Sequence, residues 1–212
     1  TNVVKLFDLY MEGEVTNGSG RIITVKAYEP GAGTKSGDAD SLVGMAMGLG
    51  ETGVPEQVRR LFAKLARSIV RASGRNEIKS LKVDLFGFSR GGAAARHASN
   101  EILRGEDGVF GKALAEQDLS WPNDVNIRFL GLFDTVAGIV NLSNLDLSAG
   151  NDRNSPVELY LDPGKVEHVV QLVAADEKRA NFALNSVRSS DDELPANFRE
   201  IILPGAHSDV GG

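Results

Sequence analysis

The sequence predicts an α/β fold with a mainly parallel sheet and helices on both of its faces. Runs of β-branched and apolar residues, typical of strands, alternate along the chain with amphipathic segments that are typical of helices. This alternation favours parallel strands joined by helical crossovers. With 212 residues, the chain is long enough to bury a core of its own. The expected strands are 21–28, 83–86, 125–133, 166–174 and 198–203.

The segments between these strands are predicted to be helices and loops. A strong helix is expected over 55–72, because it opens with Pro55 and places Val58, Phe62 and Ile69 on one face. Weaker patterns predict short helices. The remaining connections are polar or rich in glycine, and we expect loops there, one of them long enough to act as a flap. The short helices are 3–10, 93–98 and 176–185, and the connections are a turn at 12–20, an irregular insertion at 105–122 and the loop at 141–164.

Composition excludes several classes of protein. The net charge is −6, from 29 acidic and 23 basic residues with no basic block, so we expect no nucleic-acid partner. The absence of cysteine excludes disulfides and thiolate chemistry. No apolar run reaches membrane-spanning length, and no signal peptide opens the chain.

A sharp turn at Ser89 is the stretch on which the functional interpretation depends. The sequence Gly87-Phe88-Ser89-Arg90-Gly91 matches the pattern G-x-S-x-G, with an apolar strand before it and a helix after it. In that context the pattern exposes a nucleophilic serine at the tip of a strained turn. The alternative is an ordinary strand-to-helix turn.

Neighbours of Ser89 have predicted roles of their own. We expect the turn to require glycine at positions 87 and 91, because a side chain at either position would collide in so tight a turn. The Arg90 amide lies at a helix start, where it is predicted to donate to an oxyanion that develops during a reaction.

A serine nucleophile needs a base, and His207 is the best candidate among three histidines. His97 lies about two turns into the helix after Ser89, so we expect it to pack or to cap. His168 falls within a predicted strand, which favours a structural role. His207 follows a strand end in a glycine-containing loop, where sites form in parallel sheets. The alternative is a surface histidine.

The acid that orients the imidazole is predicted to be Asp134, which ends a strand. Its other interpretation is a helix N-cap. Asp209 and Asp176 are the alternatives. The chain order Ser89, Asp134, His207 is that of the α/β-hydrolases.

Three motifs together resemble one bacterial family. They are Gly87-Phe88-Ser89-Arg90-Gly91-Gly92, Phe133-Asp134-Thr135-Val136 and Gly205-Ala206-His207-Ser208-Asp209-Val210-Gly211-Gly212. In this order they resemble the α/β-hydrolase domain of type VI secretion lipase effectors. One departure is that the family opens with a strand carrying a Phe-Asp-Gly-Thr-like sequence, which this chain lacks. The resemblance implies that residues 1–212 are part of a catalytic domain, with that first strand before it and a lid or membrane-contacting module after it.

The resemblance also implies an activity, partners and a location. Ser89, Asp134 and His207 would be nucleophile, acid and base of a serine esterase that cleaves phospholipid acyl esters. The enzyme would be made in the bacterial cytoplasm and delivered without a signal peptide into a rival or host cell, to act at its periplasm or membranes. The secretion machinery and a cognate immunity protein would be its partners.

Other functions stay open at this point. A small-ester hydrolase or a peptidase would use the same residues. A non-catalytic binding module is the alternative from another class, and Gly48 to Gly53 formally match the dinucleotide pattern G-x-G-x-x-G. The stretch before that pattern is a poor strand, which favours a close-packed helix end and loop. No cofactor or metal is expected, although scattered loop acids could bind calcium without any EF-hand spacing. These acids are Asp38, Asp40, Asp146, Asp152 and Asp209.

Overall fold

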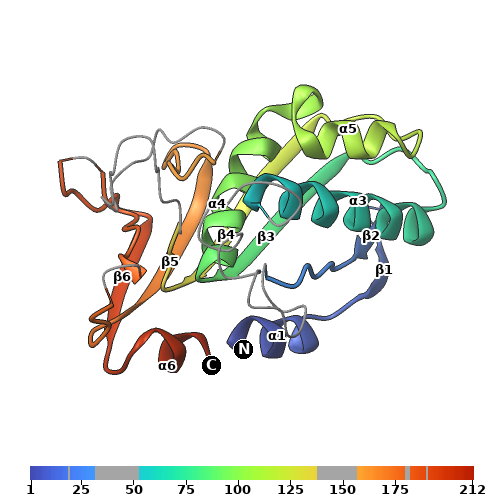
Figure 1. Ribbon diagram of the computed structural model, residues 1–212. Helices are drawn as coiled ribbons and strands as arrows, with labels where there is room; N and C mark the ends of the chain where they lie inside the picture. The colour runs from blue at the N-terminus through green and yellow to red at the C-terminus, as the bar shows by residue number, and fades with distance from the viewer. Residues whose placement is uncertain (19, 32–52, 138–156, 180–181, 190) are drawn as a thin grey trace.

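A four-stranded parallel sheet forms the centre of the protein. The computed structural model describes residues 1–18, 20–31, 53–137, 157–179, 182–189 and 191–212. The strands lie side by side in chain order (Figure 1), and every neighbouring pair is parallel. They are β3 (Ser80–Phe88), β4 (Asp124–Phe133), β5 (Val166–Ala174) and β6 (Phe198–Leu203).

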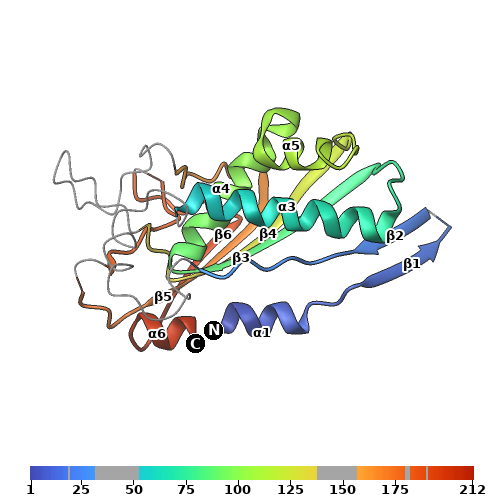
Figure 2. The ribbon, with the colours of Figure 1, turned by 45° about the vertical axis from the view of Figure 1, so that its right-hand side comes forward.

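Helices lie on both sides of this sheet. One layer holds α3 (Val54–Ser73), α4 (Arg90–Leu103) and α5 (Val109–Ala115), and the short helices α1 (Asn2–Leu9) and α6 (His207–Gly211) lie on the opposite side (Figure 2). The two short helices are joined where the Asn2 side chain donates to the Val210 carbonyl at 3.0 Å. The predicted α/β fold, with a parallel sheet covered on both faces, is thereby confirmed.

The core lies between the sheet and the layer of α3, α4 and α5. In α3, the apolar face expected from the sequence is buried, and Phe62 stacks on Phe110 of α5 with ring centroids 4.7 Å apart. In β3, alternate residues such as Val83 and Leu85 are buried beneath this layer. Apolar burial of this kind is the dominant favourable term in folding, so it holds these helices against the sheet.

Two expectations near the N-terminus were wrong. Residues 13–17 form β1 (Gly13–Asn17) rather than a turn, and the strand predicted over 21–28 is shorter, β2 (Gly20–Thr24). The two strands pair with each other as an antiparallel hairpin and not with the central sheet. Of the predicted turn 12–20, residues 13–17 and Gly20 belong to the two strands of this hairpin.

Two further expectations need correction. Residues 105–122, predicted to be irregular, contain a short 3-10 helix, η1 (Gly105–Asp107), and then α5, which packs against α3 through Phe110 and Phe62. No α-helix occurs in the described part of 176–185; residues 175–176 form a turn and the chain continues as a loop. The loop at 141–164 and the Gly48–Gly53 pattern lie mostly outside the described residues.

Candidate active site

The Ser89 turn has the strained backbone that a nucleophile elbow requires. Ser89 has φ 56° and ψ −123°, which a residue with a Cβ rarely adopts. It connects β3 directly to α4, and its carbonyl accepts the Gly92 N–H at 2.9 Å. Such strain costs on the order of 1–3 kcal/mol and persists where the surrounding structure imposes it.

The two glycines that close packing requires around Ser89 are not the two that were predicted. A Cβ at Gly87 would overlap with the Gly91 carbonyl, so this glycine is required by close packing. A Cβ at Gly91 would meet no described atom within 4 Å. Gly92 is the second constrained position, because a Cβ there would collide with the Thr135 side chain. Glycine is therefore required at position 92, where α4 approaches the loop after β4, and not at position 91 as predicted.

Strand register brings Ser89 and Asp134 to the same edge of the sheet. Phe88 pairs with Phe133, and each candidate residue follows directly. The Ser89 N–H donates to the Phe133 carbonyl at 3.0 Å, and the Val136 N–H donates to the Ser89 carbonyl at 3.3 Å. The two turns are thus hydrogen-bonded to each other at the carboxyl ends of their strands.

Asp134 and His207 form a buried pair beside this turn. The Asp134 Oδ2 lies 2.7 Å from His207 Nδ1, and both residues are about 95 % buried or more, with exposed fractions of 3 % and 5 %. The other carboxylate oxygen accepts the Ala174 N–H of β5 at 3.0 Å. Because Nδ1 is held by the carboxylate, the arrangement leaves Nε2 as the nitrogen that can exchange a proton with a substrate or nucleophile.

His207 also contacts the residue beside Ser89. The rings of His207 and Phe88 have centroids 4.6 Å apart, and a Cβ at Gly211 of α6 would overlap with the Phe88 ring. α6 therefore packs directly on the end of β3. The three residues that the sequence nominated lie at the ends of β3, β4 and β6: His207 is hydrogen-bonded to Asp134, and the Ser89 turn is hydrogen-bonded to the Asp134 turn.

The alternative candidates have other contacts. His97 is buried in α4, where Nδ1 accepts the Glu158 N–H at 3.3 Å, and burial lowers the pKa of its imidazole. His168 is exposed on β5. Asp209 accepts the Ala206 N–H and Asp176 accepts the Gly205 N–H, each at 2.8 Å. Both acids fix the backbone before His207.

Arg90 is the first residue of α4, which follows Ser89 directly. Its backbone N–H lies at the positive end of the helix dipole, where a developing oxyanion is stabilised. Burial lowers the pKa of the Arg90 guanidinium.

Among the described residues, no group of three or more His, Asp or Glu side chains is placed to hold a metal ion. Of the acids considered for calcium, only Asp209 lies within the described residues. Within those same limits, no helix is long and apolar enough to cross a membrane.

A segment that supports Asp134 was not predicted from the sequence. Asn185 lies in the polar connection after β5, yet its N–H donates to the Thr135 carbonyl at 2.9 Å and its side-chain oxygen accepts the Ala137 N–H at 2.7 Å. Buried Arg96 of α4 donates to the carbonyls of Asn185 and Ser186 at 3.0 and 3.1 Å. This segment therefore fastens the loop that carries Asp134.

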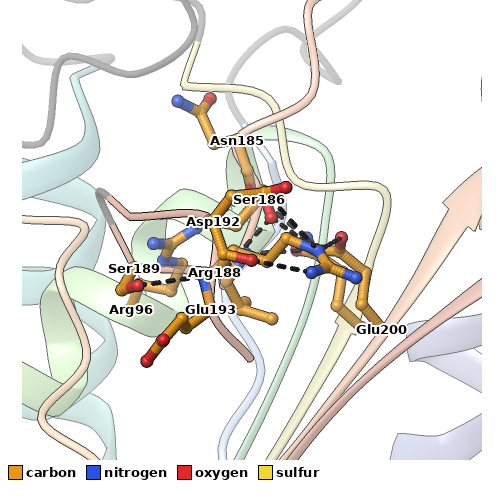
Figure 3. Close-up of polar contacts among 10 residues, drawn as sticks. Arg96, Asn185, Ser186, Arg188, Ser189, Asp192, Glu193 and Glu200 are labelled. Carbon is orange, nitrogen blue, oxygen red and sulfur yellow. Dashed lines mark hydrogen bonds and ion pairs between the residues drawn. The ribbon is translucent and has the colours of Figure 1, made fainter. Parts of the chain in front are cut away.

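Glu200 of β6 completes this support (Figure 3). Its carboxylate accepts the Ser186 hydroxyl at 2.9 Å and the Val187 N–H at 3.1 Å, and it pairs with Arg188 at 3.5 Å. No local pattern marks Arg96, Asn185 or Glu200, because their partners lie from 12 to 90 residues away in sequence.

Fold and site together define the class of protein. A parallel sheet, a strained serine turn between strand and helix, and an Asp–His pair at the same edge are the architecture of an α/β-hydrolase-type protein.

Comparisons with known proteins narrow this class to one family. Residues 112–212 match the family described as "T6SS, Phospholipase effector Tle1-like, catalytic domain". The structure is similar to the Tle1 effector in a solved structure of that effector bound to the VgrG spike from the type 6 secretion system, with 30 % sequence identity and a TM-score of 0.71. The match covers 99 % of this chain and 39 % of that chain. The chain is therefore similar to the type VI secretion Tle1-like phospholipase effectors, as the three motifs predicted, and it spans about two fifths of the length of the solved relative.

Other comparisons add little. A crystal structure of an uncharacterized protein from Pseudomonas aeruginosa is 25 % identical over 73 % of this chain and 22 % of that chain, with a TM-score of 0.38, which is too low to indicate a shared fold. No curated protein sequence matches the chain significantly.

The strain at Ser89 predicts an unusual order of stability. Ser89→Gly should be more stable than Ser89→Ala by about 1–2 kcal/mol, because glycine adopts positive φ without a Cβ penalty. Chemical denaturation of both variants measures the difference. At Ser68, inside α3, the order should reverse, with alanine more stable than glycine by about 1 kcal/mol. Equal stability of the two Ser89 variants would contradict a strained turn.

The buried Arg96 contacts predict a large loss of stability on substitution. Arg96→Met should lower the free energy of unfolding by about 1–3 kcal/mol or more, because it leaves buried carbonyls without their donor. Arg71→Met, on the exposed end of α3, should change it by less than about 0.5 kcal/mol. Similar losses in the two variants would show that the segment around Asn185 is not held by Arg96.

Proposed function

We propose that this chain carries the catalytic site of a serine esterase that hydrolyses the acyl esters of phospholipids. The observation that supports this best is the buried Asp134–His207 hydrogen bond, formed beside a serine turn with positive φ. A buried carboxylate that holds one imidazole nitrogen is how serine hydrolases prepare a base. The relationship to a family described as phospholipase effectors supports phospholipid as the substrate class.

The proposed mechanism uses groups of the chain and water. Ser89 Oγ attacks the acyl carbonyl carbon while His207 Nε2 takes the serine proton, and the C=O electrons move to oxygen. Asp134 keeps the imidazole in one tautomer and stabilises its protonated form. The Arg90 N–H and a second donor stabilise the oxyanion. Collapse of this intermediate expels the lysophospholipid alcohol, which takes the proton from His207, and leaves an acyl-enzyme. Water, deprotonated by the same base, then releases the fatty acid. No metal or other cofactor enters these steps.

The proposed setting is delivery by a type VI secretion system. The solved relative is Tle1 bound to the VgrG spike, which supports a spike or other part of the secretion machinery as a partner of this protein. We extend the proposal to action at the periplasm or membranes of a rival or host cell after synthesis in the bacterial cytoplasm. A cognate immunity protein that protects the producing cell belongs to the same proposal.

Loss of the nucleophile should abolish lipolysis. We expect fatty-acid release from mixed phospholipid vesicles by the full-length protein, and a fall of about 10⁴-fold or more in Ser89→Ala. Asp134→Asn should also lose about 10⁴-fold, because it favours the wrong imidazole tautomer. The rates are measured on the same vesicles for all three proteins.

A matched substitution separates catalysis from folding. Asp162→Asn alters an acid that accepts the Gly164 N–H at 2.8 Å before β5, at the opposite end of that strand from Ala174, and it should retain most activity. No release by the wild type would count against the phospholipase, and unchanged release by Ser89→Ala would remove Ser89 from the mechanism. Release from a soluble short-chain ester alone would favour a small-ester hydrolase.

A further inference from the structure

The surroundings of His207 contain a group of residues that the proposed mechanism does not use. Glu177, Arg179 and Phe182 follow β5 and come close to the loop that carries His207. A short helix was predicted there, but the described residues of 176–185 form no α-helix. Their contacts form a closed circuit, in which Glu177 contacts the His207 backbone, Arg179 contacts Glu177 and Phe182, and Phe182 contacts the His207 ring.

The first part of this circuit holds the backbone. Glu177 Oε2 accepts the His207 N–H at 3.3 Å. Its neighbour Asp176 makes two further contacts with Gly205: the Asp176 carboxylate accepts the Gly205 N–H at 2.8 Å, and the Asp176 N–H donates to the Gly205 carbonyl at 3.0 Å. The loop after β6 is therefore fixed to the end of β5 on both sides of Ala206.

The second part is a two-pronged ion pair. The Arg179 Nε donates to one Glu177 oxygen at 2.8 Å and an Nη donates to the other at 2.6 Å. The Arg179 N–H adds a third contact, at 2.8 Å. The Arg179 side chain hydrogen bonds lower the pKa of Glu177 to about 2, so its carboxylate is charged at neutral pH. The Glu177 side chain is only 8 % exposed, whereas Arg179 is 53 % exposed.

The third part of the circuit consists of the contacts of Phe182 with Arg179 and with the His207 imidazole. The Arg179 guanidinium lies 3.8 Å from the centre of the Phe182 ring. Phe182 in turn packs edge-on against the His207 ring, with centroids 4.8 Å apart and planes at 74°. Together with Phe88 and Asp134, this contact leaves the imidazole little freedom to change rotamer.

We propose that Glu177, Arg179 and Phe182 position the catalytic imidazole and balance the charge around it, a role that rests on the esterase function proposed above. Glu177 holds the His207 backbone, Phe182 holds the ring, and Arg179 joins the two. These are positioning residues, because none of them contacts the substrate in this role. A base that must face Ser89 through both steps gains from being held in one geometry, since small displacements of a catalytic group cost up to about 100-fold in rate.

The charge around His207 gives the proposal a specific signature. Its imidazole is hydrogen-bonded to Asp134, and Glu177, Asp176 and Asp209 lie on or beside the loop that carries it. Arg179 is the cation placed behind Phe182. Removing the Arg179 charge leaves Glu177 unbalanced, which favours the protonated, positively charged imidazole. Removing the Glu177 charge leaves the positive charge of Arg179, which disfavours it.

The test compares pH profiles of kcat/KM for a soluble ester, p-nitrophenyl butyrate, with the full-length protein. The acidic limb of this profile reports the imidazole of the free enzyme. We expect the limb to move to higher pH in Arg179→Gln and to lower pH in Glu177→Gln, and to return toward the wild-type position when both changes are combined. Arg179→Lys keeps the charge but loses the two-pronged, planar contact, so the limb should stay while kcat falls.

The ring contact is tested separately. Phe182→Leu should lower kcat roughly 10- to 100-fold with little change in KM, because it removes the aromatic surface without altering charge. The matched control is Arg59→Gln in α3. That arginine also forms a two-pronged pair with a glutamate three residues away, Glu56, but far along the chain from His207. Its kcat and acidic limb should match those of the wild type.

The outcomes separate the two proposals. An active wild type whose kcat and acidic limb are unchanged by Arg179→Gln, Glu177→Gln and Phe182→Leu would overturn the positioning role and leave the esterase intact. Equal shifts in the same direction for Arg179→Gln and Glu177→Gln would also overturn it, because they would indicate a general structural disturbance. A wild type that neither hydrolyses the ester nor reacts with a fluorophosphonate would overturn the esterase itself. If Arg179→Gln fails to fold, Arg179→Lys and Phe182→Leu still decide the question.

Discussion

The site depends on the parallel register of β3 and β4, which ends both strands at one edge of the sheet. Because Phe88 pairs with Phe133, Ser89 and Asp134 become neighbours without any direct sequence relationship. β5 adds the Ala174 N–H that orients the Asp134 carboxylate, and β6 delivers His207 to the same edge. A shift of one residue in this register would turn each candidate side chain to the other face of the sheet.

Two residues with unfavourable backbone conformations lie at this edge of the sheet, and hydrogen bonds from neighbouring segments hold them in place. Both Ser89 and Asp134 have positive φ, which costs on the order of 1–3 kcal/mol at each residue. The surrounding hydrogen bonds offset this cost: one turn is bonded to the other, and the segment around Asn185, held by Arg96 of α4, is bonded to the turn of Asp134. Glu177 extends the same arrangement to the backbone of His207. Reactive geometry is thus placed on a rigid sheet and held by side chains from outside it.

Local features of the sequence predicted a large part of this structure. The apolar face of α3, the strand before Ser89 and the three strand ends follow from periodicity and turn chemistry over a few residues. The hairpin of β1 and β2 was mistaken for a turn and a sheet strand, because nothing local says which partner a strand will choose. The role of Gly92 was assigned to Gly91, since the collision partner is Thr135 in the loop after β4, far from Gly92 in the sequence. Asn185 and Arg96 could not be found from sequence for the same reason: their partners are distant along the chain.

The most direct measurement of the central claim is the site and rate of reaction with a fluorophosphonate. We predict that the probe labels Ser89 in the full-length protein, as identified by mass spectrometry of the modified peptide. Labelling should slow by orders of magnitude in His207→Gln, because serine is a poor nucleophile without its base. Labelling of another residue, or of Ser89 at the same rate without His207, would contradict the assembly of Ser89, Asp134 and His207 into one catalytic site.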